Sequence, residues 1–243
     1  MDATYIPKDI NKFPRGYGFI FLPISMSRID NAQSAKECVQ FLDYFKEKIQ
    51  EPKVGIHFLY TEALYMSFED KAYETKNAFD QKMVNHMHGV KKLIEKDFMT
   101  FQIRDAFHFE SWFQTYLSHN DFLSFLNQVK DEHHKDELFQ KYIKEDIEDN
   151  NREYNEKQID FFLEEHAMTY LILNRQLSLD NKFVQGREEW LILSYPGKPL
   201  KAQVYLYQKD MLNLNKDSNP YKGLYNMTER VFYDFSKMNV EEM

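Results

Sequence analysis

The sequence predicts an α/β fold, built on a Rossmann-like parallel sheet with flanking helices. Short apolar runs of strand-favouring residues alternate with longer helical stretches, as in repeated strand–helix–strand units. The chain has 7 glycines and 7 prolines, which is few for an all-β fold with many turns. Its 243 residues, 43% of them hydrophobic, suffice for one sizeable buried core. We therefore expect a single domain over residues 1–243.

The first predicted unit is a strand, a tight turn and a helix. Residues 1–15 contain two prolines and little periodicity, so an irregular arm is expected there. Phe19–Leu22 is a near-continuous apolar run, typical of a strand buried on both faces. Pro23 ends the run, Ser25 follows, and residues 31–49 have helical spacing. In such sheets ligands bind beyond the carboxyl ends of the strands, so Ser25 is either a nucleophile or a simple turn residue.

The remaining elements continue the alternation of strands and helices. A dense charged tract at 130–157 is interpreted as a solvated face or a loop between helices. In order, we expect a strand at 53–60, a helix over 68–97, a strand at 98–103, mainly helices over 107–174 with breaks near 119–120 and 150–151, a strand at 189–195 and a helix over 200–212.

Composition restricts the classes of function. The formal net charge of −8 argues against a globally basic nucleic-acid or DNA-binding protein. A local basic patch stays compatible with it, because binding responds to the local field. The single cysteine, Cys38, excludes an internal disulfide, and we expect it to be a small buried helical residue in a cytoplasmic protein. No signal peptide and no run long enough to span a membrane is recognised.

Motifs for metals and nucleotides are missing from the sequence. Neither His86 and His88 nor His133 and His134 have the spacing of a zinc helix motif, so we expect solvated surface histidines and no metal site. Glycine-rich phosphate-binding loops are absent, and Gly16 and Gly18 precede the first strand instead of following it. A Gly-x-Ser-x-Gly elbow is also absent.

Two stretches in the second half of the chain could support chemistry. Glu164 and Glu165 are adjacent carboxylates within an apolar helical segment. A half-buried carboxylate would have a raised pKa and could exchange protons near neutrality, unless both reach solvent or pair with lysines. Tyr195 ends the strand at 189–195, before Pro196. It is therefore either a core residue or a member of the strand-end rim that includes Ser25.

Together, Ser25 after the first strand, Glu165 in a late apolar helix and the strand-end pair Tyr195-Pro196 resemble the tRNA-dependent cyclodipeptide synthases. Tyrosine followed by proline matches the proline-type subfamily, and the resemblance covers most of the chain. It implies a fold like the catalytic domain of class I tyrosyl- and tryptophanyl-tRNA synthetases. The sequence departs from the family pattern at three places. Pro23 stands where the family usually has glycine, and residues 26–28 do not match the residues that usually follow the serine. Phe161 replaces a tyrosine whose hydroxyl is expected to contact the substrate amino group.

The resemblance implies that two aminoacyl-tRNAs are joined into a cyclic dipeptide by an enzyme without metal or organic cofactor. Ser25 would carry the aminoacyl and then the dipeptidyl group. Glu165 would bind the substrate ammonium and help to move its proton, and Tyr195 would assist the final proton transfer. A monomer with no membrane partner is expected. The expected substrate-binding residues are Phe21, Pro23, Phe161, Met168, Leu193 and Pro196.

Transfer RNA needs a positive surface on this acidic chain. Lys92 and Lys96 are four residues apart and Lys91 lies beside them, so one helical face can present at least two charges. Arg104 could extend the patch. The other interpretation of these lysines is an ordinary solvated face. Two alternatives to the synthase also stay open: another serine-dependent aminoacyl or acyl transferase on the same fold, and a non-catalytic interaction protein.

Overall fold

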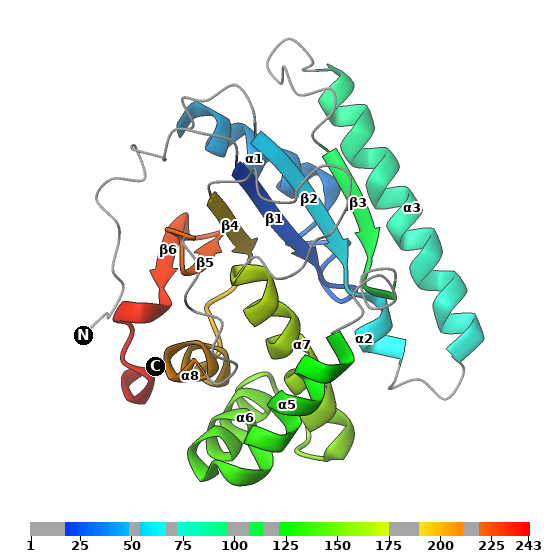
Figure 1. Cartoon of the computed structure of the whole chain (residues 1–243). Helices are drawn as coiled ribbons and strands as arrows, with labels where there is room; N and C mark the ends of the chain where they lie inside the picture. The colour runs from blue at the N-terminus through cyan, green and yellow to red at the C-terminus, as the bar shows by residue number, and fades with distance from the viewer. Residues whose placement is uncertain are drawn as a thin grey trace.

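The protein is an α/β sandwich built around one mostly parallel sheet (Figure 1). The computed structural model describes residues 18–48, 54–66, 72–96, 107–113, 122–174, 190–210 and 219–243. The described strands form a six-stranded sheet in the order β3-β2-β1-β4-β5-β6, in which β5 and β6 pair antiparallel and all other neighbours are parallel. The strands are β1 (Gly18–Ile24), β2 (Val54–Tyr60), β3 (Phe107–Ser111), β4 (Trp190–Tyr195), β5 (Gly223–Asn226) and β6 (Val231–Asp234).

Helices cover both faces of the sheet. One face packs against α1 (Ala35–Lys48) and α3 (Ala72–Lys96). The other packs against a group of four helices that Figure 1 shows together, in green to brown, in the lower half of the view. These are α5 (Phe122–Lys135), α6 (Glu137–Asp149), α7 (Glu156–Leu173) and α8 (Lys201–Lys209); the short α2 (Glu62–Met66) follows β2, and two 3-10 turns (Phe235–Lys237 and Val240–Glu242) end the chain.

Strand β1 is the centre of the fold because it is buried on both faces. Phe19 and Phe21 point into the core under α7, whereas Ile20 and Leu22 point into the core under α1. This explains the near-continuous apolar run, because a strand covered on both sides has no polar face. Gly18 permits the close approach of β4, since a Cβ there would come within 1.9 Å of the Trp190 ring.

Most predicted elements are confirmed, and the third strand is a correction. The expected strand at 98–103 lies outside the described residues, while the observed β3 begins at Phe107, inside the stretch expected to be helical. Phe107–Ser111 pairs in parallel with Ile56–Tyr60 of β2. Pairing with a formed neighbour strand decides the conformation of such a short segment more than its own propensity does.

The helical stretch is divided differently from the prediction. The expected break near 150–151 is confirmed, and the one near 119–120 lies outside the described residues. A further break falls at Asp136, which caps α6 by accepting hydrogen bonds from the backbone N–H groups of Leu138 and Phe139. The last predicted helix is shorter, because α8 ends at Asp210 in a left-handed conformation with φ 48°. The β5–β6 hairpin was not predicted.

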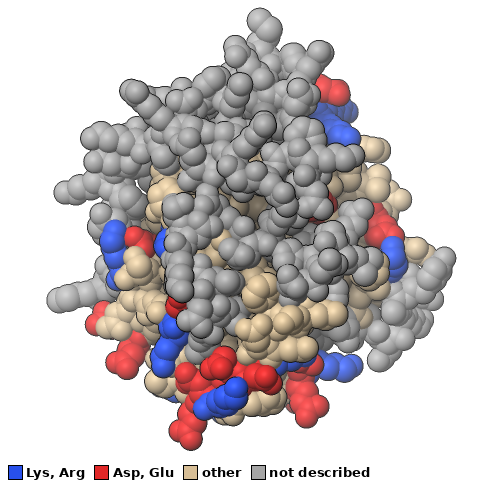
Figure 2. Space-filling view, viewed as in Figure 1, with Lys and Arg blue, Asp and Glu red and all other residues tan. Residues whose placement is uncertain are grey.

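The charged tract is confirmed as a solvated face of α5 and α6. Its exposed side chains form short-range ion pairs, including Lys141 with Glu145 and Lys144 with Glu148. Figure 2 shows acidic and basic side chains mixed at the bottom of the view, where α6 lies in Figure 1. No helix among the described residues combines the length and apolar character needed to span a bilayer.

Candidate active site

A cavity of about 250 Å³ opens at the carboxyl ends of β1 and β4, between the sheet and α7. Ser25 follows β1 directly, Tyr195 is the last residue of β4, and Glu165 lies in the middle of α7. All three side chains line this cavity. The parallel pairing of β1 with β4 places Ser25 and Tyr195 at the same edge of the sheet, which is where ligands bind in open α/β folds.

The Ser25 side chain is held within a network of hydroxyl groups. Its Oγ lies 2.6 Å from the Tyr65 hydroxyl and 2.9 Å from Ser27 Oγ. Its backbone N–H donates to Gln33 Oε1 at 2.9 Å, and Gln33 Nε2 in turn donates to the Pro23 carbonyl at 2.5 Å. The loop that carries Ser25 is therefore fixed from both sides, with 4% of the serine exposed.

His86 supports this loop and corrects the expectation of a solvated histidine. It is buried, its Nε2 lies 2.9 Å from the Gln33 carbonyl, and its Nδ1 lies 2.9 Å from the Tyr60 hydroxyl. A carbonyl can only accept, so Nε2 donates to Gln33 and Nδ1 accepts from Tyr60 in the neutral ring. Burial lowers the pKa of His86 to about 4, which agrees with that neutral form.

Glu165 places a carboxyl group that is an unusually weak acid in the cavity wall. Desolvation by burial raises its pKa from 4.5 to about 7, against the opposing influence of the Arg152 and Arg28 guanidinium groups. A carboxyl with this pKa is present in both protonation states near neutral pH. It can therefore accept and return a proton under physiological conditions.

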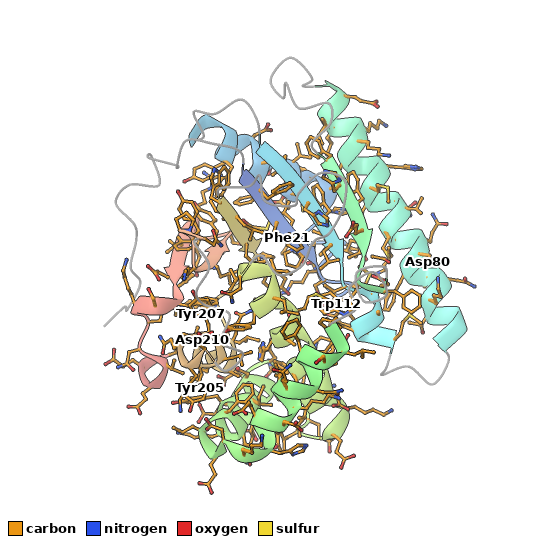
Figure 3. The ribbon with its side chains drawn as sticks, in the orientation of Figure 1. Phe21, Asp80, Trp112, Tyr205, Tyr207 and Asp210 are labelled. Carbon is orange, nitrogen blue, oxygen red and sulfur yellow. The ribbon has the colours of Figure 1, made fainter. Side chains whose placement is uncertain are left out.

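The adjacent carboxyl of Glu164 points elsewhere. Its Oε1 accepts a hydrogen bond of 2.7 Å from Trp112 Nε1. Figure 3 shows Trp112 between the end of β3 and the helical layer. Burial raises the pKa of Glu164, and the Trp112 hydrogen bond lowers it. Because Glu164 is held by Trp112, the two glutamates have different surroundings despite their adjacency.

Tyr195 closes the cavity opposite α7. Burial raises its pKa above the ordinary value and the Glu165 carboxylate raises it further, whereas Arg28 and a hydrogen bond with Ser25 lower it. The Arg28 guanidinium lies 5.2 Å from the centre of the Tyr195 ring and donates to the Pro196 carbonyl at 2.5 Å. Tyr195 therefore stays protonated and can donate a hydrogen bond at neutral pH.

Half of the expected substrate-binding residues line the cavity. Pro23, Phe161 and Leu193 do so, together with apolar side chains that include Leu64, Phe162, Ile172 and Leu224. Among the described residues, Phe21, Met168 and Pro196 are not part of the cavity wall. Phe21, labelled in Figure 3, stacks on His57 in the core beneath the cavity, with ring centres 4.8 Å apart, and Met168 is fully buried.

Several polar residues of the cavity were missed by sequence reasoning, among them a tyrosine and two arginines. Tyr65 lies at the end of α2, Arg28 in the turn after Ser25, and Arg152 in the connection between α6 and α7. The Arg152 guanidinium lies 4.4 Å from the centre of the Phe161 ring. The sequence could have indicated Tyr65, because it follows β2 closely. Since β2 pairs in parallel with β1, the residues after both strands lie at the same edge of the sheet.

Three of the predicted tRNA-binding residues, Lys91, Lys92 and Lys96, belong to α3 and are not part of the cavity wall. Lys91 and Lys92 are exposed, and Lys91 Nζ lies 5.8 Å from the centre of the Phe109 ring. The side chain of Lys96 and all of Arg104 lie outside the described residues.

The described ranges contain no group of three or more His, Cys, Asp or Glu side chains that could hold a metal ion. His133 is a second correction to the expected surface histidines, because it is buried and packs edge-on against Phe139 at 5.8 Å. His88 and His134 are exposed, and Cys38 is buried, as expected.

The sequence matches no protein-family model and no curated protein. The fold, in contrast, is similar to solved cyclodipeptide synthases. That from Bacillus thermoamylovorans aligns with a TM-score of 0.56 at 14% identity, over 83% of this chain and 85% of that one. That from Staphylococcus haemolyticus aligns with a TM-score of 0.54 at 14% identity, over 89% of this chain and 92% of that one.

A Mycobacterium tuberculosis protein aligns with a TM-score of 0.50 at 12% identity, over 76% of each chain. That structure is described as demonstrating that cyclodipeptide synthetases are related to type I tRNA synthetases. At identities this low, the structural alignments show a shared fold. The predicted α/β class, with a mostly parallel sheet and flanking helices, is therefore confirmed.

Proposed function

We propose that the protein is a cyclodipeptide synthase that joins two aminoacyl-tRNAs through aminoacyl- and dipeptidyl-serine intermediates. One observation supports this most directly: Ser25, Glu165 and Tyr195 line one cavity, in a fold shared with solved cyclodipeptide synthases. The Tyr195-Pro196 pair further favours the proline-type subfamily. The aminoacyl ester of tRNA is already activated, so the reaction needs no ATP.

In the first step Ser25 Oγ attacks the ester carbonyl of one aminoacyl-tRNA. The Oγ–carbonyl bond forms, the bond to the ribose oxygen breaks, and the serine proton ends on that oxygen. The apolar part of the cavity wall, at Leu64, Phe162 and Ile172, suits an apolar or aromatic aminoacyl side chain.

In the second step the amino group held on Ser25 attacks the second ester. An ammonium has no lone pair, so its proton must leave first. Glu165 has a pKa of about 7 and can take that proton at neutral pH. The amide forms, the second tRNA leaves, and the dipeptide stays on Ser25.

In the last step the free amine of the dipeptide attacks its own ester to Ser25. The ring closes, the cyclic dipeptide leaves, and Oγ regains a proton. Tyr195 is protonated, carries a hydrogen bond with Ser25, and is the donor that we assign to this transfer. The nitrogen loses one proton as the amide forms and Tyr195 takes it up, while Glu165 releases the proton that it accepted in the second step. The enzyme therefore returns to its starting state without a cofactor.

The test is expression in bacteria, with mass spectrometry of the medium. We expect cyclic dipeptides that are absent from an empty-vector control and from the Ser25→Ala variant. Purified protein incubated with aminoacyl-tRNA should also gain the mass of an aminoacyl group, and Ser25→Ala should not.

A second candidate is favoured by Phe161, which lacks the expected tyrosine hydroxyl: another serine-dependent aminoacyl transferase. Acylation of Ser25 without any cyclic dipeptide would select it. If Ser25 is not acylated and no cyclic dipeptide forms, both enzyme functions are rejected and a non-catalytic interaction protein is favoured.

We further propose that tRNA docks on the α3 lysines. The variant with Lys91, Lys92 and Lys96 all changed to Glu should bind aminoacyl-tRNA more weakly and with a flatter salt dependence. The matched control applies the same charge change to exposed lysines of α5 and α6, at positions 135, 141 and 144. Equal binding by wild type and the α3 variant across a salt series would place the tRNA elsewhere.

A further inference from the structure

The Ser25 hydroxyl belongs to a closed triangle of three hydroxyl groups. Ser25 Oγ lies 2.6 Å from the Tyr65 hydroxyl and 2.9 Å from Ser27 Oγ, and these two are 3.2 Å apart. Each hydroxyl has one proton and two lone pairs. A cyclic arrangement therefore satisfies all three protons and leaves one lone pair of Ser25 Oγ for Tyr195 or for a substrate carbonyl.

The Tyr65 side chain of this triangle is held by the position of α2 and by ring packing. Thr61, at the end of β2, ties the two strand ends together, because its N–H and its Oγ1 both donate to the Ile24 carbonyl, at 3.0 and 3.1 Å. Tyr65 follows four residues later. Its ring packs edge-on against Phe161 with ring centres 5.3 Å apart. The hydroxyl therefore reaches Ser25 from a ring that is fixed on its other side.

The ring that Tyr65 contacts belongs to Phe161, the residue that departs from the family pattern. Phe161 stands where the resemblance predicts a tyrosine, and both rings line the cavity. A tyrosine hydroxyl is thus missing on the α7 side and present on the adjoining α2 ring. Moving the hydroxyl from one ring to the other would keep it in the same cavity.

We infer that the Tyr65 hydroxyl is a catalytic group that orients the nucleophile and relays its proton, so that the cavity has a tyrosine hydroxyl at Ser25 although Phe161 lacks one. It orients the Ser25 proton away from the attacking lone pair. During attack it accepts that proton while passing its own onward, so its charge is unchanged and the proton reaches the leaving ribose oxygen. The inference rests on the proposed function for the identity of that leaving group.

The experiment uses two readouts on the same purified proteins. The first is cyclic dipeptide formation from aminoacyl-tRNAs. The second is the rate at which a fluorophosphonate labels Ser25, followed by intact-protein mass spectrometry with Ser25→Ala as the blank. In that reaction Oγ bonds to phosphorus, and fluoride leaves with the serine proton. Labelling reports the nucleophile without requiring tRNA, so it separates this inference from the proposed function.

We expect Tyr65→Phe to slow labelling and turnover about tenfold, the effect of losing roughly one hydrogen bond. Ser27→Ala should have a smaller effect, because it keeps the shortest contact of the triangle. Tyr225→Phe is the matched control, since it deletes a buried tyrosine hydroxyl on the other face of the sheet, and it should leave both rates unchanged. The double variant Tyr65→Phe/Phe161→Tyr should recover activity relative to Tyr65→Phe.

Several outcomes would overturn the inference. A Tyr65→Phe variant that labels at the wild-type rate removes Tyr65 from the mechanism, as does wild-type protein that is not labelled at Ser25. A double variant as slow as the single one would show that a hydroxyl on residue 161 cannot replace that of Tyr65, and would overturn the inference that the two rings can exchange it. Tyr65-dependent labelling without any cyclic dipeptide would instead support the inference and reject the proposed function.

Discussion

Two carboxyl groups on the side of the sheet that α5–α8 cover, Glu165 and Asp146, have similar acidity in different surroundings. Burial raises the pKa of each to about 7. Asp146 is enclosed in the core, where it accepts hydrogen bonds from the backbone N–H groups of Lys201 and Ala202, at 2.9 and 2.8 Å. Glu165 instead lines the cavity that also contains Ser25.

His166, the residue after Glu165, lies in the surroundings of Asp146 and not in those of Glu165. His166 is fully buried, with its Nε2 3.9 Å from Asp146 Oδ2, and burial lowers its pKa to about 3. Consecutive helical residues point about 100° apart, so α7 sends Glu165 to the cavity and His166 to the core. For a carboxyl group, a raised pKa therefore accompanies burial in general. It becomes useful for chemistry where the group meets a nucleophile and room for a substrate.

The largest expected effect separates Glu165 from its other neighbour, Glu164. Glu165→Gln removes the proton acceptor without changing shape, and should lower cyclic dipeptide formation about 100-fold. Glu164→Gln changes a carboxyl that is bonded to Trp112, and should lower it less than about tenfold. Turnover with purified aminoacyl-tRNAs measures both. Equal losses, or a larger loss at 164, would reverse the assignment.

The second prediction concerns the free energy of unfolding as a function of pH. The pKa of Glu165 is about 7 in the fold and 4.5 for an ordinary glutamate, so the folded protein binds this proton more tightly. The resulting stability is full below about pH 4.5 and is lost as the pH rises through 7. Glu165→Gln has no such proton to lose, so relative to wild type it should gain on the order of 3 kcal/mol between pH 4.5 and 8.

Urea denaturation at several pH values measures this difference. Comparing the variant with wild type cancels the similar titration of Asp146, which is present in both proteins. A difference between the two proteins that stays constant from pH 4.5 to 8 would contradict the raised pKa of Glu165.

The smallest expected effect tests the structural role of Asp146. Asp146→Ala leaves two N–H groups at the start of α8 without their acceptor, one of them on a fully buried residue. The expected loss of stability is about 1–3 kcal/mol. Denaturation at pH 8, where Asp146 is mainly ionised in both the folded and the unfolded protein, compares the variants with little difference in proton uptake. Asn155→Ala removes an exposed cap of α7 and should cost less, since water can replace it. An equal or smaller loss at Asp146 would argue against this role.

The sequence by itself predicted the central strands and several of the cavity residues. A strand covered on both faces needs a continuous apolar run, so β1, β2 and β4 were readable from local composition. Ser25 and Tyr195 follow from those strands, because the carboxyl ends of parallel neighbours meet at one edge. The placement of Glu165 on the Phe161 side of its helix also follows from local spacing.

The tertiary structure decided which distant side chains complete the cavity. Tyr65 is forty residues from Ser25, and Arg152 lies in a connection without periodicity. Phe21 and Met168 share a local pattern with cavity residues and yet lie in the core. The sequence predicted His86 to be a surface residue, whereas in the fold it is buried and hydrogen-bonded to Gln33 and Tyr60. The physical reason is that periodicity records which face of an element is apolar, whereas contacts across the fold depend on how the elements pack against one another.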